Sequence, residues 1–406
     1  MEIWRRNLYI VWIAQFITMM GMSMIVPFLP FFIRELGVRD EASVARWSGI
    51  IFSGPFIVSF FITPIWGTLG DRFGRKLIMV RAIFGLGVAQ FLTGLSQNVY
   101  QLFIFRIIQG AISGFIPSAL AFISAETPYE KKGYAIGTLQ TATSSGQLLG
   151  PLFGGVLADL IGYRHIFYLT GVLCFVSGFL LIFGAVESKK NNLKSGNELK
   201  NLIENYHFAF KNKSISIALV LIFLSQVTVM IVQPIFALFV EYVAKNVKHI
   251  STLTGIAFSI AGAFTILSAP MWGKKNDSDF RKFGFRGYKR NLIFSFSGVG
   301  FAFILQGLSN SIFVVILSRA LFGFFLGGMV PVLYSFVSRN VNEDKQGGIM
   351  GIASSFTTLS NVFLAINFLI EEKSGVKCSF CIQMGILGYL VDVRNFSSKI
   401  ISFQIK

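Results

Sequence analysis

Long apolar segments alternate with short polar segments along most of the chain. A helix that crosses the hydrocarbon core of a bilayer needs about 20 apolar residues. We therefore expect an all-α polytopic membrane protein with eleven clear spans and a twelfth, near residues 379–391, that is missing or marginal. The predicted spans are residues 8–33, 46–69, 77–96, 99–123, 133–158, 163–184, 214–241, 251–272, 291–308, 311–336 and 347–370.

The composition agrees with a lipid environment. Hydrophobic residues make up 53% of the 406 residues and charged residues only 14%, whereas soluble domains have about 25% charged residues. The net charge is +17, but the basic residues occupy alternate loops and form no single patch, which argues against nucleic-acid binding. The apolar run from Leu8 to Phe32 is too long for the core of a cleaved signal peptide, so it is interpreted as the first span.

Basic residues in alternate loops also orient the chain. They follow predicted spans two, four, six, eight and ten, whereas the loops at 96–100 and 309–311 carry no charge. Cytoplasmic loops of membrane proteins are enriched in Lys and Arg. We therefore predict that the N-terminus and the polar segment 187–213 lie in the cytoplasm.

The sequence repeats itself in two halves. Gly67 and Gly273 both follow a Pro-x-Trp motif, at an offset of 273 − 67 = 206. Arg106 recurs as Arg319, which is an offset of 319 − 106 = 213, so we expect an insertion in the second hairpin. Repeated halves joined by a polar segment predict three parts. These are an N-terminal six-helix bundle at 1–186, a linker at 187–213 and a C-terminal bundle at 214–406.

The charged hairpin after span two is a candidate conformational latch. Its glycines permit a tight turn, its aspartate can face the positive N-terminal end of a helix, and its arginines offer forked donors. Exposed ion pairs of this kind are individually weak and rearrange readily. The latch consists of Gly67, Asp71, Arg72, Gly74, Arg75 and Lys76.

Two further motifs lie within spans. Arg106 is costly inside a membrane, so its default interpretation is functional, and it stands beside Gln109 and Gly110. Small residues recur on one face of span five, where they permit close helix packing, and a proline there can supply a bend. We expect this face to form a flexing interface between the halves. Its residues are Gly146, Gly150, Pro151, Gly154 and Gly155.

The hairpin, the arginine motif and the span-five motif resemble motifs A, B and C of the major facilitator superfamily. Motif C marks the drug:proton antiporter branch, and the pattern is similar to multidrug-resistance and tetracycline-efflux carriers over about residues 1–362. The resemblance implies export of hydrophobic drug-like compounds in exchange for protons, in a bacterial inner membrane. It also implies that Asp71 engages the start of span eleven near Gly347 to Gly351, and that Arg106 assists proton coupling.

The predicted substrate cavity lacks a clear mid-span acid. Its lining would combine polar and Met side chains, which suit varied apolar ligands. Candidates are Gln15, Thr18, Met19, Met22, Gln140, Thr141, Gln226 and Gln233. Packing between helices explains the same residues equally well.

We expect a monomeric transporter, not an enzyme, whose partners are a small hydrophobic substrate, protons and lipid. The sequence has no phosphate-binding loop of the Gly-x-x-x-x-Gly-Lys-Ser/Thr type, and the proton gradient replaces a cofactor. No metal site is expected, because the three histidines lack ligand spacing and the pair Cys378 and Cys381 has no partners nearby.

The chain departs from the family pattern after about residue 362, where a Gly-Pro-rich helix and a twelfth span would follow. A shifted reading frame or a truncation is one hypothesis for this difference. Two alternatives to drug export stay open: uptake of a sugar, organic acid or other metabolite, and a carrier that has become inactive.

Overall fold

The computed structural model describes most of the first 360 residues. The described residues are 2–128, 131–187, 198–233, 235–244, 247–339, 341, 349, 352–353, 355–357 and 359–360. Predicted span eleven lies largely outside them, and the marginal twelfth span and the atypical C-terminal stretch lie wholly outside.

The first half of the chain is helical throughout its described part. Its elements are α1 (Ile3–Ile25), the 3-10 helix η1 (Val26–Phe28), α2 (Leu29–Glu35), α3 (Glu41–Phe73), α4 (Arg75–Leu95), α5 (Val99–Ile112), α6 (Phe115–Glu126), α7 (Lys132–Ile161) and α8 (Tyr163–Gly184).

The second half follows with the same kind of element. Its helices are α9 (Glu198–Lys211), α10 (Lys213–Val232), α11 (Phe236–Val243), α12 (Ile250–Phe283), α13 (Phe285–Gly307) and α14 (Ile312–Arg339). The all-α class is confirmed, since the described residues contain no strand.

Eight helical segments among the described residues are long and apolar enough to cross a membrane. They coincide with predicted spans one to four, six to eight and ten. Spans five and nine correspond to the long helices α7 and α13. The total of eleven spans stays a prediction.

Three predicted spans are interrupted helices rather than continuous ones. Span one changes to η1 at Val26–Phe28, and span seven breaks between α10 and α11. Span four breaks between α5 and α6, where Gly114 has a φ of 121°. A side chain would be strained at that angle, so glycine permits the break.

The charged hairpin after span two turns at a single residue, which is the tight turn that its glycines were expected to permit. Helix α3 continues to Phe73 and α4 begins at Arg75, so only Gly74 leaves the helical conformation, with a φ of 111°. The second hairpin is built alike: α12 runs to Phe283, and Gly284 turns the chain with a φ of 56°. The charged residues therefore extend the helices beyond the apolar segments.

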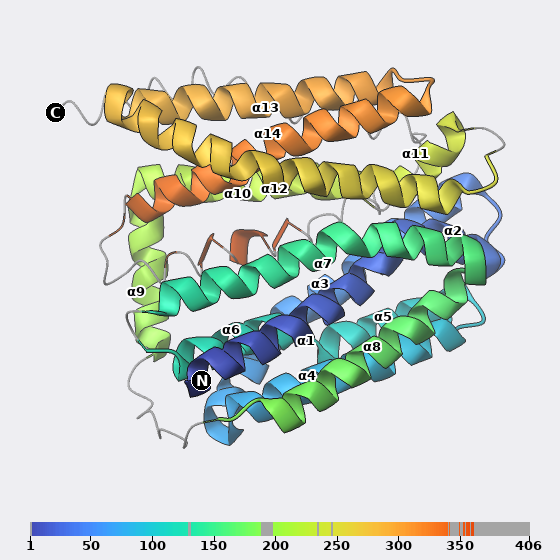
Figure 1. Cartoon of the computed structure of the whole chain (residues 1–406), viewed down its shortest axis with the longest axis horizontal. Coiled ribbons are helices and arrows are strands. Elements are labelled where there is room, and N and C mark those ends of the chain that lie inside the picture. The colour runs from blue at the N-terminus through green and yellow to red at the C-terminus, as the bar shows by residue number, and fades with distance from the viewer. Residues whose placement is uncertain are drawn as a thin grey trace.

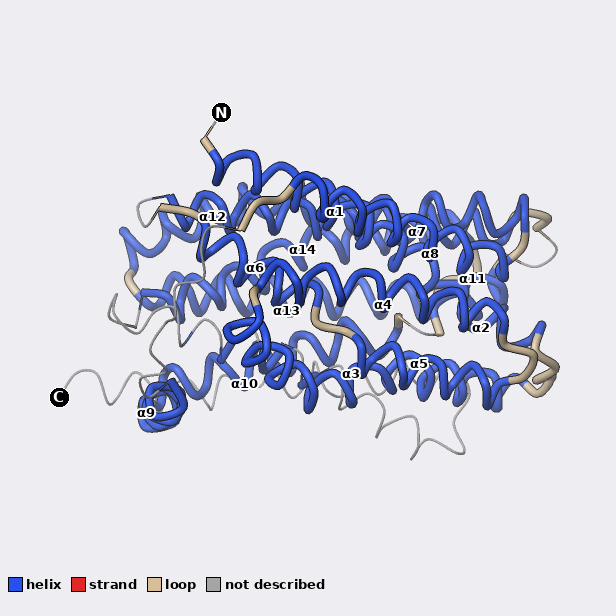
Figure 2. Tube along the Cα trace, turned by 90° about the horizontal axis from the view of Figure 1, so that it is seen from below, coloured by secondary structure: helices blue, strands red, loops and turns tan. Residues whose placement is uncertain are grey.

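The linker contains a helix that lies across the others. In Figure 1, α9 runs at the left, nearly perpendicular to the long helices, and Figure 2 shows it almost end-on. We call this side, which also holds the N-terminus, the linker end. The opposite side, with α2 and α11, is the distal end. The predicted domain boundaries at 186 and 213 stay predictions.

The internal repeat is visible in the packing. A Cβ on Gly110 of α5 would lie 2.7 Å from the Cα of Pro55 on α3, and one on Gly323 of α14 would lie 3.0 Å from the Cα of Ala261 on α12. The offsets are 323 − 110 = 213 and 261 − 55 = 206, as the sequence predicted. In both halves a glycine lets these helix backbones approach closely.

Two tryptophans occupy equivalent positions in the two halves and make equivalent hydrogen bonds. Trp66 Nε1 donates to the Ala111 carbonyl at 2.9 Å, and Trp272 Nε1 donates to the Phe324 carbonyl at 2.9 Å. The same two offsets relate donors (272 − 66 = 206) and acceptors (324 − 111 = 213), so both copies of the motif have one structural role.

Each half has its own hydrophobic core, and a third cluster joins them. One core contains buried residues between Trp4 and Ala185, and another contains residues between Ala209 and Ala353. The third cluster combines α1, η1, α2, α3, α5, α7 and α8 with residues of α10 and α11. In Figure 1, α7 and α12 converge toward the distal end and separate toward the linker end. The halves therefore meet mainly at the distal end.

We expect Gly110→Ala and Gly323→Ala to lower stability similarly, because each new methyl group would overlap the backbone of the facing helix. Overpacking of this kind costs about 1–3 kcal/mol. Loss of the monodisperse peak after heating of detergent-purified protein measures the effect. Gly137→Ala is the matched control, because nothing lies within 4 Å of its added Cβ. Equal heat resistance of Gly110→Ala and Gly137→Ala would contradict the packing role.

Candidate functional site

The latch residues that the structure describes bind within their own half. The backbone N–H of Arg75 donates to Glu187 Oε1 at 2.7 Å, and its guanidinium donates to the Ala121 carbonyl at 2.9 Å. Lys76 Nζ donates to the carbonyls of Ile182 and Ala185 at 2.8 and 2.6 Å. These bonds tie the α3–α4 turn to α6 and to the end of α8.

Among the other latch residues, the structure describes the side-chain contact of Arg72 but not the surroundings of Gly67 and Asp71. The guanidinium of Arg72 lies 5.2 Å above the Phe73 ring. The side-chain environments of Gly67 and Asp71 lie outside what the structure describes, as does the predicted contact near Gly347 to Gly351. The latch role of Asp71 therefore stays a prediction.

An arginine that the sequence analysis did not single out supports this turn. Arg81 on α4 lies 3.3 Å from the centroid of the Trp66 ring and donates to the Ile112 carbonyl at 2.8 Å. Ile112 is the last residue of α5, where helix carbonyls lack an intrahelical partner. A cation inside predicted span three was the available signal, and the contacts show that Arg81 joins α4 to the end of α5 and to Trp66 of α3.

Arg106 is buried, with only 5% of its surface exposed. Its Nη1 donates to Gln109 Oε1 at 3.1 Å, the Phe167 ring centroid lies 6.0 Å away, and its Nε has no hydrogen-bond partner. Gln109 in turn approaches Met22 Sδ at 3.9 Å. The structure therefore brings Arg106 and Gln109 together, while Gly110 serves the close contact with α3.

Arg319 is the repeat counterpart of Arg106 and is also buried, but its neighbours differ. The Phe236 ring centroid lies 3.5 Å from its guanidinium carbon, and Phe258 and Phe322 lie at 5.2 and 5.5 Å. A cation over aromatic faces is favoured electrostatically, more so when it is desolvated. The repeat thus preserves the arginine and changes its surroundings.

The glycine face of α7 is only partly the predicted interface between the halves. Gly146, Gly150 and Gly154 pack against α1 of the same half, where an added Cβ on each would lie within 3 Å of α1 backbone atoms. This part of the prediction is wrong, because the three glycines share one face of α7 and that face lies against α1. The close packing itself is as expected.

Pro151 and Gly155 are the motif residues that face the other half. An added Cβ on Gly155 would lie 3.0 Å from Thr252 Cα, and one on Gly255 would lie 3.0 Å from the carbonyl carbon of Pro151. One helical turn nearer the linker end, Ser259 Oγ donates to the Leu148 carbonyl at 2.7 Å. Small residues on both α7 and α12 therefore permit the contact between halves.

The residues expected to line a substrate cavity are not one group. Gln15 is fully buried and donates to the Leu139 carbonyl and to Thr143 Oγ1, at 3.3 and 2.6 Å, so it holds α1 against α7. Trp12 Nε1 donates to Thr141 Oγ1 at 2.9 Å. Packing therefore accounts for the amide N–H groups of Gln15, whereas its buried Oε1 has no hydrogen-bond partner and its cavity role stays a prediction.

For the other candidates, the role in lining a substrate cavity stays a prediction. Met22 accepts hydrogen bonds from Gln90, at 2.9 Å, and from Gln109, so it joins the Arg106 group. Gln140 is exposed, and Gln233 has a buried Oε1 without a hydrogen-bond partner. Met19, Thr18 and Gln226 are buried or half-buried on α1 and α10. Gln90 was missed, although a glutamine inside span three was visible.

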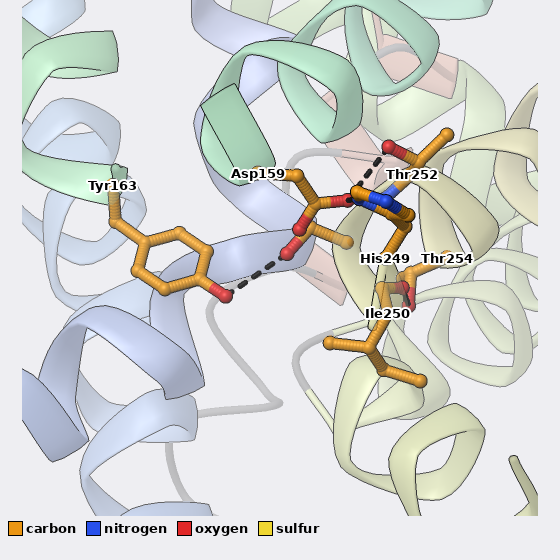
Figure 3. A network of polar contacts seen from close by, with 7 residues as sticks. Asp159, Tyr163, His249, Ile250, Thr252 and Thr254 are labelled. Atoms are coloured by element: carbon orange, nitrogen blue, oxygen red, sulfur yellow. Dashed lines mark hydrogen bonds and ion pairs between the residues drawn. The ribbon is translucent and has the colours of Figure 1, made fainter. Parts of the chain in front are cut away.

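Polar contacts between the halves at the distal end were also missed. Asp159 near the end of α7 binds Thr252 near the start of α12, and Arg34 of α2 pairs with Glu241 of α11 at 2.6 Å (Figure 3 shows the first group). The sequence placed Asp159 at a helix end, but nothing in it showed which helix lies opposite.

Known proteins share both the sequence pattern and this arrangement of helices. The family model described as Major Facilitator Superfamily matches residues 11–365. The Multidrug resistance protein MdtG of Proteus mirabilis is 34% identical over 378 residues, covering 90% of each chain. The MdtG of Salmonella typhi is 33% identical over 386 residues, covering 95% of this chain and 93% of that protein.

The longer match extends beyond the expected limit of likeness. A match over 95% of 406 residues leaves about 20 residues unmatched, fewer than the 406 − 362 = 44 residues that follow Val362. The similarity to MdtG therefore continues past residue 362.

Solved structures show the same fold. The nucleoside transporter NupG superposes with a TM-score of 0.73 at 13% identity, over 96% of this chain and 98% of NupG. A D-xylose-proton symporter superposes with a TM-score of 0.70 at 17% identity, over 97% of each chain. At this identity the likeness concerns the fold alone.

We expect an added methyl group to have different effects on the two sides of α7. Gly150→Ala would wedge α1 from α7 inside one bundle, so we expect lower heat resistance of the purified protein. Gly155→Ala would act at the contact between the halves and leave the packing within each bundle unchanged, so we expect a smaller loss of heat resistance together with faster proteolysis or thiol labelling of the distal end. Identical behaviour of the two variants would contradict the assignment of the two faces.

Proposed function

This chain belongs to the Major Facilitator Superfamily, and we propose that it exports hydrophobic drug-like compounds in exchange for protons. The observation that carries the proposal is its identity of 33–34% to proteins named Multidrug resistance protein MdtG, over 90–95% of the chain. A major facilitator protein is a multi-pass membrane transporter and not an enzyme. The drug substrate and the proton exchange are the proposed part.

We place the protein in a bacterial inner membrane, with the linker end in the cytoplasm. Charge supports this orientation, because Arg72, Arg75 and Lys76 and the basic residues near Gly284 lie at the turns of that end. The described contacts between the halves are concentrated at the distal end, so we propose that this end is closed in the present arrangement. Export then requires separation of the distal contact and closure of the linker end.

Arg106 and Gln109 are the residues that we assign to proton coupling. A guanidinium inside the membrane costs at least about 2.5 kcal/mol, and its Nε is buried without a partner. Such a group favours the ionised form of any nearby acid and therefore alters proton affinity when the halves move. The proton gradient supplies the energy, and we propose a monomer without a cofactor.

The α3–α4 turn is the proposed latch of the opposite conformation. Its described basic residues bind the N-terminal half in the present arrangement. Closure of the linker end would bring the second half toward this turn. Asp71 could then accept from the free amides at the start of predicted span eleven.

Efflux in the presence and absence of a proton gradient tests the proposal. Cells producing the chain should retain less of a fluorescent hydrophobic cation, and a protonophore should abolish the difference. We expect Arg106→Ala to reduce gradient-dependent efflux at least about tenfold, the typical size of a lost proton-transfer contribution being 10²–10⁴-fold. Asp71→Asn should slow efflux less.

The controls separate coupling from folding. Arg106→Lys keeps the charge without the forked donors, and Gly137→Ala should transport normally. Equal retention in producing and non-producing cells for a panel of dyes would contradict drug export. Gradient-driven accumulation of a sugar, nucleoside or organic acid would instead support uptake, which the fold likeness to NupG and the xylose symporter also allows.

A further inference from the structure

The distal contact contains a carboxylate from one half that caps a helix of the other. Asp159 lies two residues before the end of α7, and its Oδ2 accepts from the backbone N–H of Thr252 at 2.8 Å and from Thr252 Oγ1 at 2.6 Å (Figure 3). Thr252 is the third residue of α12. Its N–H is one of the first amides of a helix, which have no acceptor within that helix.

The geometry is that of a helix N-cap supplied in trans. An N-cap side chain normally precedes its own helix and accepts from the second or third amide. Here the chain between Asp159 and Thr252 includes the whole of α8 to α11, so the cap exists only while the halves are together. The negative charge also faces the positive end of α12.

Neighbouring contacts shield this bond from water. Tyr163 OH and Ser251 Oγ are 2.9 Å apart, and an added Cβ on Gly155 would collide with the backbone of Ser251. The Asp159 side chain is 11% exposed, whereas His249, whose Nδ1 lies 3.9 Å from Asp159, is 72% exposed. The carboxylate therefore lies inside the contact and the histidine at its edge.

The ion pair between the halves, Arg34 with Glu241, is more exposed. Arg34 and Glu241 are 29% and 40% exposed at their side chains. Exposed ion pairs contribute little, because water and salt screen them. Hydrogen bonds to an ionised acceptor that is shielded from water are about twice as strong as neutral ones.

We propose that Asp159 is the gate residue of the distal end. Its carboxylate holds the halves closed by capping α12, and outward opening requires that the cap break and that water replace it on both sides. The inference rests on the proposed alternation between two open ends, although it is independent of the substrate. Arg34 and Glu241 have a minor part in closure.

The test measures access to a thiol behind the gate. Ser259→Cys places the thiol on α12 two turns inside Ser251, in a background with Cys174→Ala, Cys378→Ser and Cys381→Ser. A membrane-impermeant maleimide added outside intact cells labels this thiol only when the distal end opens. We expect slow labelling in the parent and labelling about tenfold faster with Asp159→Ala, the size expected for loss of a charge-assisted hydrogen bond.

Matched variants separate charge, hydrogen bond and folding. Asp159→Asn keeps an acceptor and loses the charge, so its labelling rate should lie between those of the parent and Asp159→Ala. Thr252→Val keeps the backbone N–H and loses one of the two bonds, with a similar intermediate result. Arg34→Ala should change the rate less than about twofold, as expected for an exposed ion pair. Variants are compared at equal amounts of monodisperse protein.

The outcomes are decisive in either direction. A lower melting temperature for Asp159→Ala and Asp159→Asn with unchanged labelling would overturn the proposal, because it would show a cap that stabilises both conformations equally. Faster labelling with Arg34→Ala than with Asp159→Ala would also overturn it. Absence of drug efflux together with the predicted labelling would contradict the proposed substrate and leave the gate standing.

Discussion

The contact between α7 and α12 sets how the two halves are arranged, because each half also packs around a hydrophobic core of its own. The contact is built from small residues, with Gly155 against Ser251 and Gly255 against Pro151. Helices in lipid gain no hydrophobic energy by associating, so close packing and polar bonds must hold them. Such a contact is compact, and it is continuous with the apolar cluster that joins the two halves.

The two faces of α7 pack against different parts of the molecule. The face toward α1 uses three glycines spaced four apart, and it belongs to one rigid bundle. The face toward α12 adds polar bonds from Asp159 and a shared apolar cluster of α2 and α11 residues. Both faces therefore combine the close approach of small residues with hydrogen bonds, and the contact between the halves adds a charged acceptor, Asp159.

Much of the fold could be predicted from the sequence, because its signals are periodic or local. Span lengths, the Gly74 turn and the two offsets are of this kind, and the structure reproduces the offsets in Trp66 and Trp272. The partners of each helix face could not be predicted, since spacing shows that Gly146 and Gly150 share a face but not which helix covers it. For the same reason, the sequence could not show that Gln15 binds α1 to α7.

The sequence could predict which side chains are functional candidates, but it could not predict which side chains surround them. Arg106 and Arg319 were visible as cations in apolar segments, but the aromatic rings around them come from distant parts of the sequence. Arg106 keeps Gln109 as a polar partner, whereas the Nε atoms of both arginines are buried without a hydrogen-bond partner. Arg319 lies against Phe236, whose ring stabilises a cation and offers it no proton acceptor. The duplicated position therefore keeps a polar partner in the first half and packs α14 against α11 in the second, so that equivalent positions have different surroundings.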